Sequence, residues 1–272
     1  MCRWLAYIGP PVEMAALVLR PRHSLVRQSL SSSRGVTPVN GDGFGLAWWG
    51  NKPEPGRFCD TLPAWNDANL RSLTEQIESR LFFAHVRAST GTETSRANCH
   101  PFTYRHMGFM HNGQIGGWYH IRRAVEALIP DDLYRERKGT TDTEALFLLA
   151  VANGLLDDPL GGLARAVGLV RGEMLAAGIT QPFRMTSAIS DGERVVCARW
   201  SSDGQSPSLF SAPSSAISGF TSHDLGLENA WLILSEPLDE EADDWSPVAE
   251  GSALIAAPDS AVCLSFEPEL PA

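Results

Sequence analysis

The chain has 272 residues, of which 43% are apolar and 20% are charged, and its formal net charge at pH 7 is -10. This composition supports a sizeable core and excludes disorder as the default state. The chain contains no block rich in lysine or arginine, so nucleic acid and anionic membranes are poor candidate partners. No apolar run approaches the roughly 18 residues that a transmembrane helix requires.

The five cysteines lie at positions 2, 59, 99, 197 and 263, and no two of them form a Cys-x-x-Cys pair. An odd and scattered set supports neither a disulfide framework nor a zinc ribbon. The apolar part of the N-terminus is too short for a signal peptide. We therefore expect a reduced, cytoplasmic protein.

The first half of the chain is predicted to begin with strands and to continue with helices. We expect strands over residues 2–8 (closed by Gly9-Pro10-Pro11), 44–49 and 57–60, helices over 12–19 and after a cap at Asn66 or Asp67, a loop over 31–38 and a turn over 40–43. The apolar runs 81–84 and 107–110 are typical of buried strands. Between them lies a polar stretch rich in histidine, and polar groups at the ends of buried strands are common in functional sites.

The second half is predicted to pass from helices to strands. Helices are expected over 121–128, over 145–156 after a capping box at Thr141-Asp142-Thr143-Glu144, and over 163–174, with a charged loop after Pro130. Strands are expected over 184–190 and 194–200 as a hairpin, and over 230–235, 253–256 and 261–266, with loops at 201–207 and 211–218. This order predicts one α+β domain of stacked layers over residues 1–272. The pattern alone does not give the order of the layers.

Cys2 is a candidate nucleophile. Removal of Met1 would make it the N-terminal residue, and its own α-amine, with a pKa of about 7.7–8.0, could then act as the adjacent base. The alternative is a cysteine that follows Met1 without a chemical role, and the residue taken alone favours that alternative.

His111-Asn112-Gly113 directly follows a predicted strand. An Asn-Gly pair in that position commonly forms a turn, because glycine tolerates positive φ. The amide of Asn112 and the backbone N–H of Gly113 could instead stabilise an oxyanion, where one donor contributes roughly 2.7–4 kcal/mol in the transition state.

Arg87 and Asp142 are candidates for binding a charged substrate. Arg87 ends a predicted buried strand, so its guanidinium needs a partner, which is either a structural carboxylate or a substrate carboxylate. Asp142 lies in the first turn of a predicted helix, where it complements the helix dipole or binds a substrate ammonium. Together the two side chains would recognise the head group of an α-amino acid.

A metal site is the less favoured interpretation of the histidine-rich stretch. His85, His100, His106 and His111 lie near Cys99, but their spacing matches no common structural zinc pattern. We expect these imidazoles to make hydrogen bonds within the fold, and we expect no metal and no cofactor.

The order of these motifs is more specific than any one of them. The segments are Met1-Cys2-Arg3, Asn40-Gly41-Asp42-Gly43-Phe44-Gly45, His85-Val86-Arg87-Ala88-Ser89-Thr90, Asn98-Cys99-His100-Pro101-Phe102, His111-Asn112-Gly113 and Thr141-Asp142-Thr143-Glu144. In this order they resemble the class II glutamine amidotransferases, which are N-terminal nucleophile hydrolases. The later part, including Leu232 to Leu238, resembles the stand-alone bacterial members that have no synthase domain.

The resemblance implies a four-layer αββα sandwich of two antiparallel sheets and an enzyme that cleaves the side-chain amide of glutamine. Cys2 would form a γ-glutamyl thioester, and Asn112 and Gly113 would form the oxyanion hole. Arg87 would bind the substrate carboxylate, Asp142 its ammonium group and Thr90 a further part of the substrate. Ammonia and glutamate would be the products, with a separate synthase as a possible ammonia acceptor.

Two positions depart from the larger synthases of the family, which have tryptophan where this chain has Ala88 and histidine where it has Gly91. The pocket or its lid is therefore expected to differ from theirs. A hydrolase of γ-glutamyl amides or peptides, similar to the ergothioneine-pathway members, is the first alternative function. A non-catalytic binding module with a silent site is the second.

Overall fold

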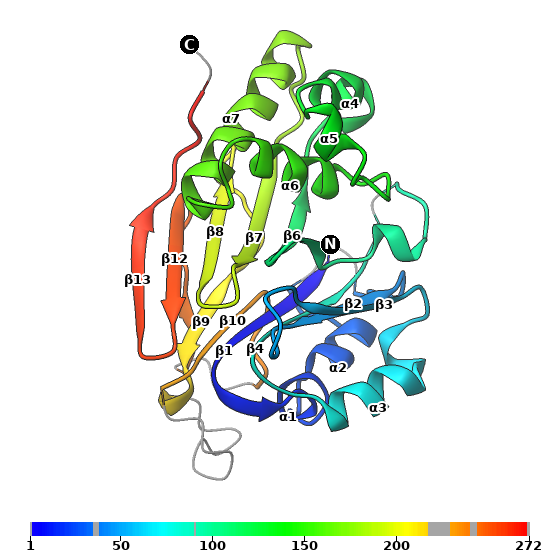
Figure 1. The fold of residues 1–272 in the computed structure, drawn as a ribbon, viewed down its shortest axis with the longest axis vertical. Coiled ribbons are helices and arrows are strands. Elements are labelled where there is room, and N and C mark those ends of the chain that lie inside the picture. The colour runs from blue at the N-terminus through cyan, green and yellow to red at the C-terminus, as the bar shows by residue number, and fades with distance from the viewer. Residues whose placement is uncertain (1, 35–37, 90, 217–228, 240–243, 271–272) are drawn as a thin grey trace.

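A computed structural model describes residues 2–34, 38–89, 91–216, 229–239 and 244–270 (Figure 1). Two antiparallel sheets form the middle of the molecule. The first has the strand order β11-β9-β10-β1-β4-β2-β3, and the second has the order β13-β12-β8-β7-β6-β5. In the described ranges, no helix is both long enough and apolar enough to cross a membrane.

The strands of the first sheet are β1 (Arg3–Glu13), β2 (Phe44–Trp48), β3 (Gly56–Asp60), β4 (Glu78–Val86), β9 (Phe210–Pro213), β10 (Trp231–Leu234) and β11 (Ser246–Pro247). Those of the second are β5 (Phe102–Tyr104), β6 (Met107–Gln114), β7 (Arg184–Ser190), β8 (Val195–Ser201), β12 (Ser252–Ala257) and β13 (Ser260–Ser265). The helices are α1 (Ala15–Val18), α2 (Leu25–Leu30), α3 (Ala68–Gln76), α4 (Trp118–Ala127), α5 (Asp131–Tyr134), α6 (Asp142–Ala152) and α7 (Pro159–Ala176). Short 3₁₀ turns cover Ala64–Asn66, Arg96–Asn98 and Ser214–Ala216.

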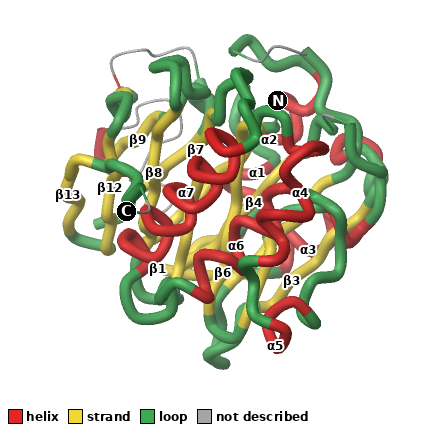
Figure 2. The backbone as a smooth tube through the Cα atoms, turned by 90° about the horizontal axis from the view of Figure 1, so that it is seen from above, coloured by secondary structure: helices red, strands yellow, loops and turns green. Residues whose placement is uncertain are grey.

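The helices cover the two outer faces of the paired sheets. Helices α1, α2 and α3 pack on the first sheet, and α4, α6 and α7 lie across the second (Figures 1 and 2). Strand β1 shows how the sequence builds these layers, because successive side chains of a strand point to opposite faces. Trp4 and Ala6 belong to the cluster between the sheets, whereas Leu5 and Tyr7 belong to the cluster under α1, α2 and α3. The predicted four-layer αββα sandwich is confirmed.

Strand β1 does not end at the predicted glycine–proline turn. It continues through Gly9, Pro10 and Pro11 to Glu13, and its pairing with β4 shifts register between Ile8 and Val12. Proline has no N–H to donate to a strand ladder, so the interrupted pairing accommodates both prolines without ending the strand.

Other differences involve short elements whose stability depends on tertiary packing. Helix α2 lies in a region for which no element was predicted, helix α5 lies in the predicted charged loop after Pro130, and β9 occupies part of the predicted loop 211–218. Residues 217 and 218 of that predicted loop lie outside the described residues. Strand β9 is held by pairing with β10 and β11, partners that are distant in the sequence.

Candidate active site

A small pocket is lined by residues from the start of the chain, the ends of β4 and β6 and the first turn of α6. The register explains the convergence, because Arg3 at the start of β1 is opposite Val86 at the end of β4. The lining residues are Cys2, Arg87, Ala88, Ser89, Thr92, His100, His111, Gly113, Thr141, Asp142 and Thr143. The structure therefore brings together Cys2, Arg87, Gly113 and Asp142 from among the predicted site residues. Thr90 lies outside the described residues.

Cys2 is half-buried at the entrance to β1. Its Sγ atom donates a weak hydrogen bond to the carbonyl oxygen of Ala88, at 3.6 Å. Burial raises the pKa of the Cys2 thiol above its ordinary value. Since the thiolate is the reactive form of cysteine, a thiol with a raised pKa needs a neighbouring base to become a nucleophile.

The guanidinium group of Arg87 is buried, with 2% of the residue exposed. It donates to the carbonyl oxygens of Asp42 (3.3 Å) and Glu93 (3.2 Å) and to the hydroxyls of Ser89 (3.2 Å) and Thr92 (2.7 Å). Every one of these acceptors is neutral. Within the described ranges, Arg87 has no carboxylate partner, although an unpaired buried charge is costly. The structural-carboxylate alternative is therefore not supported by the described contacts.

Asp142 is the first residue of α6 and links that helix to the end of β6. Its Oδ2 atom accepts a hydrogen bond from the backbone N–H of Ile115 at 3.1 Å, and Oδ1 accepts from the N–H of Thr143 at 2.8 Å. The carboxylate is therefore fixed at a helix N-terminus and also lines the pocket.

The predicted capping box at the start of α6 is only half formed. Thr141 Oγ1 accepts from the backbone N–H of Glu144 at 3.1 Å, as predicted. The Glu144 carboxylate, however, does not return to Thr141 but accepts from the N–H groups of Lys138 (2.9 Å) and Gly139 (2.7 Å). The preceding loop folds back and supplies these donors, so Glu144 holds the loop against the helix.

Asn112 and Gly113 lie within β6, opposite Thr186 and Met185 of β7, so the expectation of an Asn-Gly turn is wrong. Gly113 has φ 151°, and a Cβ atom there would collide with the carbonyl oxygen of Arg184. Glycine is therefore required by both backbone conformation and space. Asn112 is fully buried, and neither polar atom of its side chain has a partner in the described part of the chain. Gly113 lines the pocket but Asn112 does not.

Three of the four predicted histidines are buried beside the pocket. The rings of His85 and His100 lie 4.2 Å apart, and His111 Nδ1 lies 2.8 Å from Thr143 Oγ1. Burial lowers the pKa of all three imidazoles, that of His85 to about 3, so they are neutral at pH 7. The expectation of internal hydrogen bonds holds for His111 but not for His100, whose ring nitrogens have no partner among the described residues. No group of three or more metal-binding side chains gathers in the described ranges.

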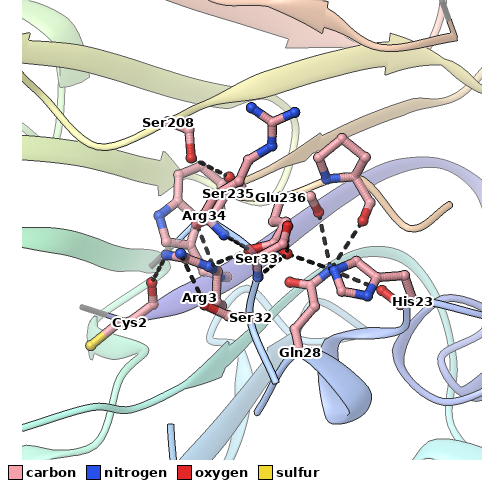
Figure 3. Close-up of polar contacts among 12 residues, drawn as sticks. Cys2, Arg3, His23, Gln28, Ser32, Ser33, Arg34, Ser208, Ser235 and Glu236 are labelled. Carbon is pink, nitrogen blue, oxygen red and sulfur yellow. Dashed lines mark hydrogen bonds and ion pairs between the residues drawn. The ribbon is translucent and has the colours of Figure 1, made fainter. Parts of the chain in front are cut away.

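Sequence reasoning missed two charged residues that are linked to Cys2 through the Arg3 side chain. Arg3 and Glu236 form an ion pair with Nε and Oε2 2.9 Å apart, and 1% of each side chain is exposed (Figure 3). The available signal was an arginine within an otherwise apolar predicted strand. Its partner is 233 positions away, so local patterns could not identify it.

Glu236 should make acid stability depend on this network. Burial by itself raises the pKa of its carboxyl group, but bonds from His23 and Ser33 and the charge of Arg3 together hold the pKa below its ordinary value. A carboxyl group with a lowered pKa in the folded state stabilises the fold above its unfolded pKa, about 4.3. This stabilisation is lost as the pH falls from there through the lower folded value. We expect the difference in unfolding free energy between wild type and Glu236→Gln, measured by urea denaturation, to be constant from pH 7 to 5 and to shrink towards pH 3. A difference that grows on acidification would contradict the ionised state of Glu236.

Comparison with known proteins identifies a family whose members are similar to this chain in sequence. A family model for class-II glutamine amidotransferases matches residues 19–201. The probable glutamine amidotransferase DUG3 of Saccharomyces cerevisiae is 34% identical over 93% of this chain and 81% of its own length. The γ-glutamyl-hercynylcysteine sulfoxide hydrolase of Mycolicibacterium smegmatis is 25% identical over 92% of this chain and 93% of its own.

Solved structures agree with this fold. A glutamine aminotransferase class-II domain protein from Silicibacter pomeroyi superposes with a TM-score of 0.76 and 36% identity, covering 98% of this chain and all of that one (100%). The glutamine phosphoribosylpyrophosphate amidotransferase of B. subtilis has a TM-score of 0.62 at 13% identity, covering 99% of this chain and 50% of that one. The second similarity is evidence for the fold alone.

Proposed function

Since this chain belongs to the class II glutamine amidotransferases, an enzyme family acting on amide C–N bonds, we propose that it hydrolyses the side-chain amide of glutamine through a γ-glutamyl thioester on Cys2. The observation that carries the proposal is the buried guanidinium of Arg87. It faces the same pocket as Cys2 and Asp142 and has no carboxylate partner in the described ranges. A substrate with an α-carboxylate would supply the missing negative charge.

The pocket can recognise both charges of a glutamyl head group. Arg87 would hold the α-carboxylate, which a guanidinium grips with parallel hydrogen bonds. Asp142 would hold the α-ammonium, and Thr90 is proposed as a further contact. This assignment leaves the γ-amide free to reach Cys2, because the same pocket contains all three side chains that the structure describes.

The chemical steps use groups at the start of β1 and in β6. With Met1 removed, the α-amine of Cys2 accepts the thiol proton, and the sulfur attacks the amide carbon. The Asn112 side-chain amide and the Gly113 N–H then stabilise the negative oxygen of the tetrahedral intermediate. Collapse of the intermediate breaks the C–N bond, and the amine proton passes to the departing ammonia. Water hydrolyses the thioester, releases glutamate and restores the thiol.

Hydrolysis of other γ-glutamyl amides is the second candidate function. The relatives from Mycolicibacterium smegmatis and Mycobacterium tuberculosis named γ-glutamyl-hercynylcysteine sulfoxide hydrolase favour it. Arg87 and Asp142 would contact only the glutamyl part, which both substrate classes share. The ratio of kcat/KM for glutamine to that for γ-glutamyl dipeptides separates the candidates, and a ratio well below one would favour the second.

We also propose that residues 1–272 form a single amidotransferase domain. The pairing of β1 with β10 and of β8 with β12 supports this, because each sheet includes strands from distant parts of the chain. Any ammonia acceptor would then lie outside residues 1–272, as a separate synthase would.

The proposed function is tested by intact mass before and after incubation with 6-diazo-5-oxo-norleucine, an electrophilic mimic of glutamine. We expect loss of Met1 and a single adduct that maps to Cys2. Absence of an adduct on protein with a free N-terminal Cys2 would contradict glutamine as the substrate and favour another γ-glutamyl amide or a silent site.

Arg87→Lys should weaken substrate capture more than catalysis. A lysine ammonium keeps the charge but cannot reproduce the paired bonds of a guanidinium. Since a hydrogen bond to a charged group contributes about 1.5–3 kcal/mol, we expect KM for glutamine to rise roughly 10- to 100-fold with a smaller change in kcat. Steady-state ammonia release measures both constants.

Arg199→Lys is the matched control for this variant, because Arg199 also donates to a hydroxyl and a carbonyl (Ser206 and Val248) but does not line the pocket. Its KM should remain at the wild-type value. An unchanged KM in Arg87→Lys would exclude Arg87 as the carboxylate-binding residue.

A further inference from the structure

We propose that Arg3 and Glu236 are positioning residues that fix the backbone of Cys2 for attack. This inference rests on the proposed role of Cys2 as nucleophile. It concerns a buried network on the side of β1 that faces away from the second sheet, where Leu5 and Tyr7 pack under the helices. The network is drawn in Figure 3, where Arg3 lies between Cys2 and Glu236.

Cys2 needs support from a side chain because it precedes the strand. Strand β1 begins at Arg3, whose partner in β4 is Val86. The Cys2 thiol itself makes only a weak 3.6 Å contact with a carbonyl oxygen. Arg3 supplies the stronger hold, because its Nη1 atom donates to the Cys2 carbonyl oxygen at 2.8 Å. That bond fixes the orientation of the peptide group that follows the nucleophile.

The three nitrogens of the Arg3 guanidinium bind three different partners. Nη1 binds Cys2, Nε binds Glu236 Oε2 at 2.9 Å, and Nη2 donates to Ser32 Oγ at 3.2 Å. A planar guanidinium holds these directions together, so the position of Glu236 determines the direction of the bond to Cys2. Lysine could keep the charge pair but could not make all three bonds.

Glu236 is itself held by several donors. Its Oε1 atom accepts from His23 Nε2 (2.6 Å) and from the N–H (2.8 Å) and hydroxyl (2.7 Å) of Ser33, and Oε2 also accepts from the N–H of Arg34 (3.2 Å). The neighbouring Ser235 completes the support. Its N–H donates to the carbonyl oxygen of Trp4 at 3.0 Å, and its Oγ accepts from the N–H of Trp4 at 3.1 Å. The Glu236 carboxylate is therefore held by hydrogen bonds from His23, Ser33 and Arg34, and the backbone beside it is bonded to β1 at Trp4.

A purely stabilising role explains this arrangement poorly. Buried ion pairs are often no more stabilising than well-packed apolar residues of similar volume, because both charges must be desolvated. Here the pair lies on the side of β1 whose next residues, Leu5 and Tyr7, belong to an apolar cluster. Only one guanidinium nitrogen, Nη1, donates to the main chain, and its acceptor is the carbonyl oxygen of the nucleophile Cys2. Glu236 also lies outside residues 19–201, the part matched by the family model. The C-terminal part of the chain therefore contributes to the geometry at its first residues.

The test uses protein from which Met1 has been removed. We compare Glu236→Gln and Arg3→Lys with Val170→Ala, a core truncation in α7 that should lower stability at a residue outside the pocket lining. Both network variants should lose at least tenfold in kcat for glutamine while KM stays within about threefold, because Arg87 and Asp142 are untouched. Val170→Ala should keep the wild-type kcat although its melting temperature falls as much as, or more than, that of the two network variants.

A second measurement reports the position of the thiol directly. The rate of Cys2 labelling by 6-diazo-5-oxo-norleucine requires alignment with a bound glutamyl group, whereas labelling by iodoacetamide, mapped to the Cys2 peptide, requires only access. The ratio of the two rates should fall at least tenfold in both network variants and remain unchanged in Val170→Ala.

Each outcome has one interpretation. Wild-type kcat and labelling ratio in folded Arg3→Lys or Glu236→Gln would overturn the inference while leaving the proposed function intact. If Glu236→Gln does not fold, Arg3→Lys decides, because it retains the charge pair. Undiminished turnover in Cys2→Ala, measured in parallel, would overturn the proposed function and this inference together.

Discussion

Replacement of Cys2 by alanine is expected to reduce amide hydrolysis about 10⁴-fold or more while the fold stays intact. The loss should be this large because the thioester route needs the sulfur atom and Cys2 is the only cysteine among the described residues that line the pocket. Cys99 precedes His100, which lines the pocket, but Cys99 is fully buried and its Sγ faces the carbonyl oxygens of Asp60 and Ser95. Ammonia release from glutamine measures the effect.

The fold should tolerate this change. Cys2 is half-buried, and its side chain makes only the weak contact with Ala88, so near-UV circular dichroism and the melting temperature should match wild type. A matched protein that retains Met1 keeps the thiol but lacks the free amine, and we expect it to be strongly impaired as well. Turnover in the alanine variant above a hundredth of the wild-type rate would exclude the proposed nucleophile.

Asn112→Ala is expected to lower kcat about 10²- to 10³-fold, the usual cost of removing one oxyanion donor. The side-chain amide of Asn112 is fully buried and has no partner among the described residues, although an unsatisfied buried polar group costs about 1–3 kcal/mol. Such a cost is more readily explained at a site where charge develops during the reaction than in a structural core. KM should change little, because the proposed interaction is made with the negative oxygen of the transition state and not with the bound substrate.

The unfolding free energy distinguishes this role from a structural one. Removal of an amide without partners relieves its desolvation cost, so we expect Asn112→Ala to lose no more than about 1 kcal/mol of stability. Asn153→Ala is the matched control, because the Asn153 amide donates to the Leu149 carbonyl oxygen at 2.7 Å at the end of α6. It should lose stability but keep kcat. A stability loss in Asn112→Ala without a change in kcat would contradict the oxyanion role.

Local sequence patterns identified the elements whose signals lie within a few neighbouring residues. The apolar runs 81–84 and 107–110 are strands, Asp67 caps α3 through the N–H of Leu70, and the periodic residues from 163 to 174 lie in α7. Each of these depends on periodicity or a cap within a few residues. The layer order came only from the family resemblance, since pattern alone does not determine how sheets stack.

Features that depend on distant partners were not predictable in the same way. The sequence around Asn112 and Gly113 favours a turn, but pairing with β7 makes it a strand. Glu144 has the spacing of a capping box, but its carboxylate binds the preceding loop. Glu236 lies in the segment Leu232 to Leu238, which contributed only to the family resemblance. Its ion pair could not be predicted, because its partner Arg3 is 233 positions away. In each case a tertiary contact replaced the local preference.

The central position of β1 has a consequence for motion. This strand is bonded to β4 on one side and β10 on the other, so its amide hydrogens exchange with solvent only when the sheet itself opens. Cys2 is thus joined to a strand that is paired on both sides, which favours a precisely held reacting atom. By contrast, three of the four acceptors of the Arg87 side chain, which are Ser89, Thr92 and Glu93, come from the chain that follows β4. We therefore expect the residues that hold Arg87 to move when substrate enters or product leaves, whereas Cys2 stays in place.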